Sequence, residues 1–273
     1  MSKLSDAVKA LINASHAAPG ITKASPQVQP ALKRFAEDAH KKQVGLPSWV
    51  SISTAVSATM NCPDAMTSIF HLANEKSDNP NSSTRNAELI REVGLKCISF
   101  NGIPRSINCL GAFHASLPDD VARALQARPP TRELTPANVE ARKAGGLALW
   151  DSVYTGFERK LLAKLGASHP DLPVHILNGH YANLLSNPPR DEVLADRAQT
   201  GVGPQVVSHI FGLRKAYEQG DAHAAGEEEV QGGVWLASDE GSVWLLEHID
   251  RLVEAIGGAG QGTTFAPGIK AKL

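Results

Sequence analysis

Apolar residues recur at helical spacing along almost the whole of this chain, and no other sequence feature restricts its fold as strongly. Side chains three and four positions apart lie on one face of an α-helix, so each such segment predicts a helix with a buried stripe. The segment at 63–76 is typical, with Met66, Ile69, Phe70 and Ala73 on one face. No Asn-Gly or Asp-Gly turn joins two alternating strands, which is the pattern of a hairpin. The predicted fold class is therefore all-α.

Gly and Pro divide the chain into these helices. Gly102 is suited to end one helix, and Pro104 suits the first turn of the next because that position needs no backbone N–H. The residues expected to face inward on that next helix are Ile107, Leu110 and Phe113 or His114. The predicted helices cover 5–14, 28–42, 48–60, 63–76, 87–100, a segment from 104, 147–165, 191–198, a segment through 217, and 242–258. Residues 117–146 are expected to form a linker with one short helix.

The two long helices of the second half have clear apolar stripes. The inward residues expected on the first are Leu147, Trp150, Tyr154, Phe157, Leu161 and Leu165, and Gly166 is expected to end it. The inward residues expected on the last are Val243, Leu246, Ile249, Val253 and Ile256.

One sequence motif, which we call the phrase, occurs twice in the chain. "FNGIPRSINCLGAF" at 100–113 and "TGVGPQVVSHIFGL" at 200–213 both place Gly shortly before Pro, with β-branched, small polar and aliphatic residues at matching positions. The segments "LPSWVSISTAVSATMNCP" and "LPVHILNGHYANLLSNPP" also begin and end alike. This pattern is typical of two copies of one helical unit. We expect a single domain over 1–256, with repeats at about 27–128 and 136–256, followed by a flexible tail at 257–273.

Composition excludes several classes of function. The 273 residues include 27 Lys and Arg against 28 Asp and Glu, so the net charge of -1 gives no reason to expect a nucleic acid or an anionic membrane as partner. No apolar stretch approaches the roughly 20 residues of a membrane span. Cys62, Cys97 and Cys109 are an odd number without paired spacing, which is typical of a reducing compartment. The expected partner is a small molecule or a protein.

The last three residues, Ala271, Lys272 and Leu273, are a conservative variant of the Ser-Lys-Leu address that the peroxisomal import receptor reads. The Gly-rich stretch before them would let the receptor reach the terminal carboxylate. This predicts a protein of the peroxisomal matrix with the import receptor as a partner. A chance match stays open, as does a mitochondrial or cytoplasmic location.

The stretch "AELIREVGLKCISFNGIPRSINCLGAF" resembles the end of the repeated unit in AhpD-like proteins, the alkylhydroperoxidase and carboxymuconolactone decarboxylase superfamily. In that family an acidic helix leads into a Gly-x-Pro corner and a further helix. The second half resembles a diverged copy, and most of 27–256 is similar to fungal AhpD-like proteins with a peroxisomal C-terminus. The resemblance implies two helical units packed about a pseudo-twofold axis, and protomers that associate into a homo-oligomer.

The best-known chemistry of the resembled family uses a CxxC pair and a His four residues after it. A thiolate attacks peroxide, its partner resolves the sulfenic acid, and the His with a nearby Glu moves the protons. If His71 takes the family's His position, the cysteine positions fall on Asp64 and Thr67, so the dithiol is absent. Cys62 lies two residues upstream and is the remaining candidate for a reactive thiol. The other two cysteines are expected to be buried small hydrophobes.

His71, His180 and His209 stand out as polar residues on otherwise apolar helices. Each is either a hydrogen-bonded core histidine or a proton carrier that faces a pocket between the two units. No pair of histidines has the HExxH pattern of a zinc site, and we predict neither a metal nor a cofactor.

Arg105 follows the Pro of the first corner, in the first turn of a helix, where a cation is electrostatically misplaced. We expect it to form an ion pair with Glu88 or Glu92, or to bind the carboxylate of a ligand.

Three functions follow from these observations. The first is an enzyme that acts on a small organic acid or oxygenated metabolite by acid/base chemistry, in the manner of the decarboxylase branch of the resembled family, with His71 or His180 as proton carrier. The second is a catalytically inactive member that keeps the scaffold for ligand binding or assembly. The third is residual thiol hydroperoxidase activity through Cys62 alone.

Overall fold

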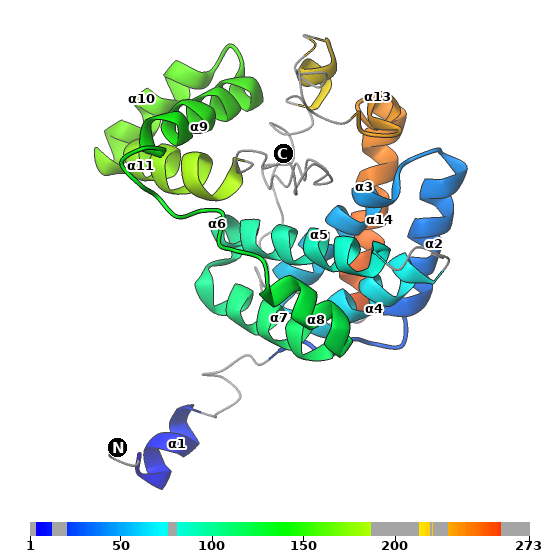
Figure 1. Ribbon diagram of the computed structural model, residues 1–273. Helices are drawn as coiled ribbons and strands as arrows, with labels where there is room; N and C mark the ends of the chain where they lie inside the picture. Colours follow the sequence, from blue (N-terminus) through cyan, green and yellow to red (C-terminus); the bar gives the residue numbers. More distant parts are fainter. Residues whose placement is uncertain are drawn as a thin grey trace.

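The computed structural model describes residues 4–12, 21–75, 81–186, 213–218, 220 and 229–257. Within these ranges every regular element is a helix and none is a strand, so the all-α prediction is confirmed for this part of the chain (Figure 1). The helices are α1 (Asp6–Ile12), α2 (Val28–Lys41), α3 (Leu46–Thr59), α4 (Pro63–Asn74), α5 (Ser82–Lys96), α6 (Ile98–Asn101), α7 (Ile103–Ser116), α8 (Asp119–Gln126), α9 (Val139–Tyr154), α10 (Glu158–Ser168), α11 (Asp171–His175), η1 (Ile176–Leu185), α13 (Gly233–Leu236) and α14 (Asp239–Gly257).

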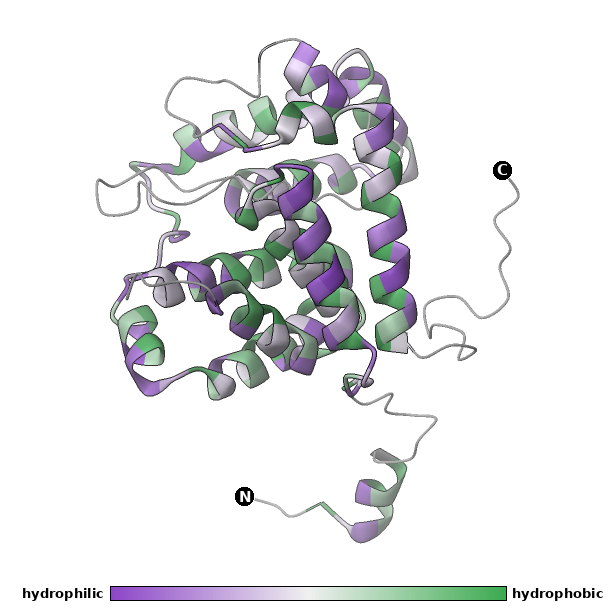
Figure 2. Cartoon of the chain, turned by 90° about the vertical axis from the view of Figure 1, so that its right-hand side faces the viewer, coloured by the Kyte–Doolittle hydropathy of each residue, from purple (hydrophilic) through white to green (hydrophobic). Residues whose placement is uncertain are grey.

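Helices α2–α8 and α14 form the larger of two bodies, and α9–α11 with η1 form the smaller one (Figure 1). Helix α1 stands apart from both in the two perpendicular views (Figures 1 and 2). The core of the larger body is built from one face of α2–α5, α7, α8 and α14. Its buried apolar residues include Leu32, Phe35, Val50, Val56, Met66, Ile69, Phe70, Ile90, Cys109, Phe113, Val121, Leu125, Leu252 and Ile256. The inward stripe predicted for 63–76 is confirmed, because its four residues are all buried.

Hydrophilic and hydrophobic residues alternate around the helices of the larger body (Figure 2). None of the helices in the described ranges combines the length and the apolar character that are needed to cross a lipid bilayer.

The first Gly-Pro corner has the predicted form. Helix α6 ends before Gly102, which has a φ of 76°, and Pro104 lies in the first turn of α7. A positive φ is a conformation that glycine adopts at little cost, so the residue type fits the turn. The corner therefore reverses the chain between α6 and α7 as the sequence predicted.

The inward face of α7 differs from the prediction by a rotation of the helix. Phe113 is buried as expected, but Ile107 was also expected inside and is 65% exposed, whereas Ser106 and Cys109 are buried. Apolar spacing fixes the period of a buried stripe but not its phase, and here the phase is set by the contact of α7 with α4 and α5.

The helix predicted at 147–165 is two helices. Gly156 has a φ of 85° and lies between α9 and α10, in the left-handed conformation that commonly ends a helix. Phe157, expected inside, is 63% exposed at this break, and Leu147 is also exposed. Gly166, which we expected to end the helix, lies within α10.

The predicted linker at 117–146 contains α8 and the first half of α9, so the extended connection between the two bodies is shorter than expected. We call this connection, residues 127–138, the strap. It crosses the face of α5 on its way to α9 (Figure 1).

Helices α9 and η1 make the close contact of the smaller body. A Cβ atom added at Gly146 would lie 2.4 Å from the Cα of Ala182, so the two backbones can approach only because residue 146 is a glycine. Trp150 packs edge-on against Tyr181, with ring centroids 5.0 Å apart. Helix η1 is a π-helix, and its last turn closes with a bond from Ser186 N to Tyr181 O of 3.0 Å.

Helix α14 closes the core of the larger body. Val243 was expected inside but is 57% exposed, whereas His248 and Leu252 are buried together with Ile256. The helix is rotated because it packs on α2, where the ring of His248 stacks on Phe35 at 4.5 Å. A core position is thus taken by a histidine that the sequence pattern did not single out.

The described residues contain only part of the predicted repeats. Residues 200–212 of the second phrase, the helix predicted at 191–198 and residues 258–273 of the tail lie outside them. The two segments that begin with Leu-Pro are both helical, the first as α3 and the second as α11 and the π-helical η1.

Candidate functional site

A cavity of about 760 Å³ opens on the surface between α5, α7, α8 and the strap. We call it the groove. Its apolar wall consists of Leu95, Leu110, Phe113, Leu117 and Leu125, and its charged wall consists of Glu88, Arg91, Glu92, Arg128, Arg132 and Glu133. This volume and the mixture of an apolar wall with a few charged groups are typical of a small-molecule site.

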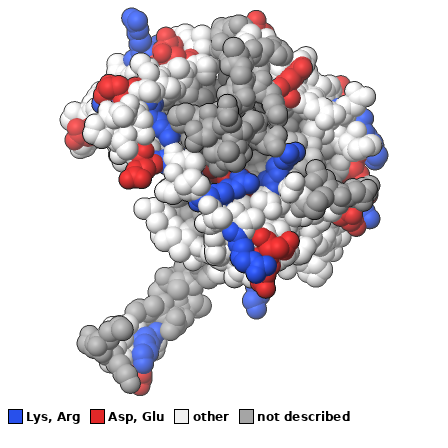
Figure 3. Space-filling view, viewed as in Figure 1, with Lys and Arg blue, Asp and Glu red and all other residues white. Residues whose placement is uncertain are grey.

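Two glutamates of α5 form the floor of the charged wall. Glu88 and Glu92 are four residues apart, so both lie on the helix face that the strap covers. Glu88 is buried and pairs with Arg91 and, at 3.7 Å, with Arg128 of the strap. Lys and Arg side chains accordingly gather across the middle of this face of the molecule, where the two bodies meet (Figure 3).

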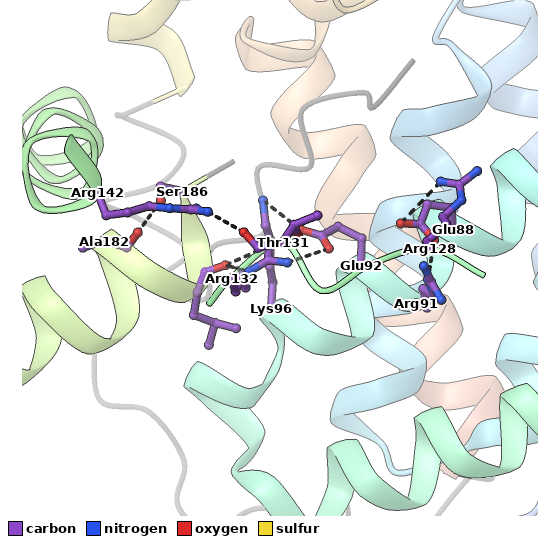
Figure 4. A network of polar contacts seen from close by, with 11 residues as sticks. Glu88, Arg91, Glu92, Lys96, Arg128, Thr131, Arg132, Arg142, Ala182 and Ser186 are labelled. Atoms are coloured by element: carbon purple, nitrogen blue, oxygen red, sulfur yellow. Dashed lines mark hydrogen bonds and ion pairs between the residues drawn. The ribbon is translucent and has the colours of Figure 1, made fainter. Parts of the chain in front are cut away.

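Arg132 of the strap joins the two bodies. Its Nη1 donates to Glu92 Oε2 at 3.1 Å (Figure 4). Its Nε donates to the carbonyl oxygen of Leu184 at 3.3 Å. Glu92 also lies 3.8 Å from Lys96, one turn further along α5. On one side of this contact are the C-terminal end of α5 and the short helix α6, and on the other side is η1. Arg132 bonds to both sides, and we call the contact the seam.

Helix α9 adds a second arginine beside the seam. The side chain of Arg142 reaches from α9 toward the strap, and its Nη2 donates to the carbonyl oxygen of Thr131 (Figure 4). The residue is only 6% exposed. Burial lowers the pKa of this guanidinium, and the nearby charge of Arg132 acts in the same direction.

His180 faces the end of α5 across the seam. Its Nδ1 lies 2.7 Å from the hydroxyl of Ser99, a hydrogen bond between segments 81 residues apart. His180 and Leu184, which accepts from Arg132, are four residues apart on η1. Ser99 follows Lys96, which lies beside Glu92, by three residues. The Ser99–His180 hydrogen bond therefore lies next to the contacts of Arg132. Burial and, to a lesser extent, His175 lower the pKa of His180, so its imidazole is neutral at pH 7 and is able to accept a proton.

The other predicted histidines are not at the seam. His71 is exposed on α4, where its ring contacts Phe70 edge-on at 5.6 Å. Neither His71 nor His180 is among the residues that line the groove. His209 and the targeting residues Ala271, Lys272 and Leu273 lie outside the described residues.

The three cysteines are buried and free, so the expectation of small hydrophobic cysteines is confirmed for Cys97 and Cys109. Burial raises the pKa of Cys62 to about 11, that of Cys97 to about 12 and that of Cys109 to about 11. The nucleophile in peroxide reduction is the thiolate, and a thiol with such a pKa is protonated at neutral pH.

Arg105 binds the C-terminal end of the neighbouring helix α3. Its Nη1 donates to the carbonyl oxygen of Thr59, the last residue of α3, at 3.0 Å. A cation is favourable at the C-terminus of a helix, so this contact offsets its unfavourable place at the start of α7. The ion pairs described above for Glu88 and Glu92 are with Arg91, Arg128, Lys96 and Arg132.

Comparison of this chain with protein-family models, with curated proteins and with solved structures gave no match in any of the three. Function therefore has to be inferred from the groove and the seam themselves. Among the residues that the structure describes, no group of three or more His, Cys, Asp or Glu side chains has the geometry to hold a metal ion.

Sequence reasoning named His180 but missed its hydrogen-bond partner Ser99, and it also missed Arg132 and Arg142. A signal for the strap was present in "ARPPTRE" at 127–133, where two prolines separate two arginines and prevent a helix. An extended, basic segment that follows an acidic helix in the chain is a reason to expect ion pairs between them. No local pattern marks Arg142, because its role depends on the packing of α9 against η1.

Proposed function

We propose that this chain is an AhpD-like helical protein that binds a small organic acid in the groove and acts on it by acid/base chemistry at the seam. The observation that carries the proposal is the hydrogen bond between Ser99 and His180, next to Arg132, which belongs to both the seam and the lining of the groove. The resemblance of the Gly102–Pro104 corner to the AhpD-like pattern and the helical character of the described residues support the family assignment.

His180 is the proposed proton carrier. In the tautomer with the proton on Nδ1, the ring donates to Ser99 Oγ, and Nε2 keeps a lone pair that accepts a proton from a substrate. Ser99 is then a positioning residue that fixes the orientation and the tautomer of the ring. The lowered pKa keeps the imidazole neutral, as a base at pH 7 requires.

A second candidate is a ligand-binding member of the family without turnover. It is favoured by the ion pairs of Glu88 and Glu92, because both carboxylates of the groove are engaged with cations of the protein itself. Residual hydroperoxidase activity through Cys62 has less support, since that thiol is buried and its pKa is raised.

The remaining expectations belong to the same proposal. We propose two diverged repeats about a pseudo-twofold axis, a homo-oligomer, and import into peroxisomes through Ala271, Lys272 and Leu273. A fluorescent protein fused to residues 258–273 tests the last of these. Peroxisomal fluorescence that disappears when the final three residues are removed supports import, and diffuse or mitochondrial fluorescence of the intact fusion contradicts it.

Turnover of small organic acids tests the acid/base chemistry. The purified full-length protein is incubated with a panel of small hydroxy, keto and unsaturated carboxylic acids, and consumption of each acid is followed by proton NMR. We expect turnover of at least one acid, and a loss of about 10²–10⁴-fold in His180→Gln, which removes the base. His71→Gln is the matched control and should retain the wild-type rate. Turnover that survives in His180→Gln contradicts the assignment, and binding without any turnover favours the second candidate.

A further inference from the structure

Three arginines line the groove, and two of them are each held by a carboxylate and a backbone carbonyl. Arg91 pairs with Glu88, and its Nη1 donates to a carbonyl oxygen of α8 at 3.2 Å. Arg132 pairs with Glu92, and its Nε donates to a carbonyl oxygen of η1 at 3.3 Å. A ligand that bound either guanidinium would have to displace a contact that holds helices together.

Arg128, the third arginine of this lining, has donors available. Its Nη1 lies 3.7 Å from Glu88 Oε1, which is close enough for an ion pair but too far for a hydrogen bond. Its side chain makes no hydrogen bond to any described residue, and 31% of that side chain is exposed. Glu88 is also paired with Arg91, so its charge stays compensated when Arg128 turns to a ligand (Figure 4).

Arg128 lies next to the apolar wall of the groove. Its backbone N–H donates to the carbonyl oxygen of Leu125, a residue of that wall, at 3.3 Å. Pro129 and Pro130 follow it in the strap, and their rings restrict the backbone beside it. A ligand in the groove therefore meets an available guanidinium beside an apolar surface.

The carboxylates of the lining restrict the charge of such a ligand. Glu88 and Glu92 are each paired with two cations, so neither is available to bind a cationic ligand. Glu133 is exposed and lies five residues beyond Arg128 in the strap. All three repel a second negative charge in the cavity. The lining therefore suits an acid with one carboxylate and an apolar body.

We infer that Arg128 binds the carboxylate of the substrate, and that the substrate is a monocarboxylic acid with an apolar body. A planar guanidinium holds a carboxylate through two parallel hydrogen bonds, which suits the available donors. The apolar body lies against Leu110, Phe113 and Leu125 of the groove. This inference rests on the proposed function, since it names the class of substrate and the group that holds it, but it concerns binding and not turnover.

Thermal unfolding of the full-length protein with defined probes tests this assignment. Phenylacetate and hexanoate are the two monocarboxylates. Phenylacetamide lacks the charge, phenethylamine reverses it, and phenylmalonate adds a second carboxylate. We expect each saturating monocarboxylate to raise Tm by at least about 4 °C, because a ligand that binds only the folded state stabilises it. The other three compounds should leave Tm within about 1 °C of the unliganded value.

Variants of Arg128 show whether this residue holds the carboxylate. Arg128→Met keeps a long side chain and removes the charge, so we expect a folded protein whose Tm no longer responds to phenylacetate. Arg128→Lys keeps the charge next to Glu88 but lacks the planar donors, and it should weaken binding by about 10-fold or more. The matched control is Arg123→Met, which changes an exposed arginine of α8 outside the groove lining and should respond like the wild type.

The outcomes separate the binding of the acid from its turnover. A full response to phenylacetate in Arg128→Met overturns the inference, as does a wild-type protein that responds to neither monocarboxylate. An equal or larger response to phenylacetamide, phenethylamine or phenylmalonate overturns the class of ligand. A response that depends on Arg128, without turnover of any acid, supports the inference and contradicts only the proposed chemistry. Turnover that Arg128→Met leaves unchanged contradicts the inference and leaves the role of His180 intact.

Discussion

Arg132 and Glu92 form an ion pair beneath the strap, and both side chains are largely buried, at 15% and 13% exposure. Because Arg132 also donates to the carbonyl oxygen of Leu184, this pair connects α5 of the larger body to η1 of the smaller one. The groove, the Ser99–His180 contact and Arg142 all lie next to it. Together with the Ser99–His180 hydrogen bond, this bridge holds the two bodies in contact at the candidate site.

Arg132→Met should destabilise the protein by about 2–4 kcal/mol, because it leaves the buried carboxylate of Glu92 with a weaker set of partners and the Leu184 carbonyl without its donor. Urea unfolding measures the change. The control is Arg251→Met, which breaks the exposed pair of Arg251 and Glu247 and should cost less than about 0.5 kcal/mol. Equal effects of the two substitutions would mean that the bridge under the strap is no more than a surface ion pair.

Two adjacent glycines of α9 should respond in opposite directions to alanine. A Cβ at Gly146 would meet the backbone of Ala182, so Gly146→Ala should force α9 and η1 apart and cost about 1–3 kcal/mol. A Cβ at Gly145 has no atom within 4 Å, so Gly145→Ala should stabilise the helix by about 0.5–1 kcal/mol. The free energies of unfolding of the two variants check this contrast. A neutral Gly146→Ala would argue against the close packing of these helices.

The cysteines should be unreactive in the folded protein. With pKa values of about 11, 12 and 11 and with buried side chains, Cys62, Cys97 and Cys109 carry almost no thiolate at pH 8. We expect a thiol reagent such as dithiobisnitrobenzoate to label none of them within minutes until the protein is unfolded, when all three react. Rapid labelling of Cys62 in the folded state would contradict this prediction and would support the hydroperoxidase hypothesis.

His248 should make stability depend on pH. Its pKa is lowered from the ordinary value of 6.5, first by burial between α2 and α14 and then by the balance of Arg251, Asp38, Arg34 and Glu247 around it. The unfolded chain therefore takes up a proton at a higher pH than the folded one, so stability is retained above pH 6.5 and is lost as the pH falls below it.

Replacement of this histidine checks the sign of that dependence. His248→Gln cannot be protonated, and its free energy of unfolding should fall less steeply between pH 7 and pH 5 than that of the wild-type protein. The comparison uses the slope and not the absolute stability, because the loss of the stacking on Phe35 lowers stability at every pH. An unchanged slope would show that His248 does not govern the acid sensitivity.

The sequence was a good guide to the helices and an uneven guide to their buried faces, since the stripe at 63–76 is buried as predicted. The corner at Gly102 and Pro104 was predictable because Gly and Pro each restrict the backbone in a known way. The exposed positions of Ile107 and Val243 were not, since the choice of buried face depends on partners far away in the chain. The break at Gly156 was missed because a glycine within an apolar pattern is compatible with either a helix or its end.

The residues of the candidate site also differ in how far the sequence predicts them. His180 was identifiable as a polar residue in an apolar segment, but the contact with Ser99 joins positions 81 residues apart and requires η1 to pack against α6. Arg142 is one of several cations in its segment, and only the packing of α9 makes it a buried one. A local sequence pattern therefore identifies a functional residue only when the contacts that define its role lie close to it in the sequence.

The titration of His180 tests the central proposal, a neutral base at the seam, most directly. Its ring proton is followed by NMR and is assigned by the loss of the signal in His180→Gln. We predict a pKa below the ordinary value of 6.5, because burial and, to a lesser extent, the charge of His175 disfavour the protonated ring. A pKa at or above 6.5 would contradict the neutral base.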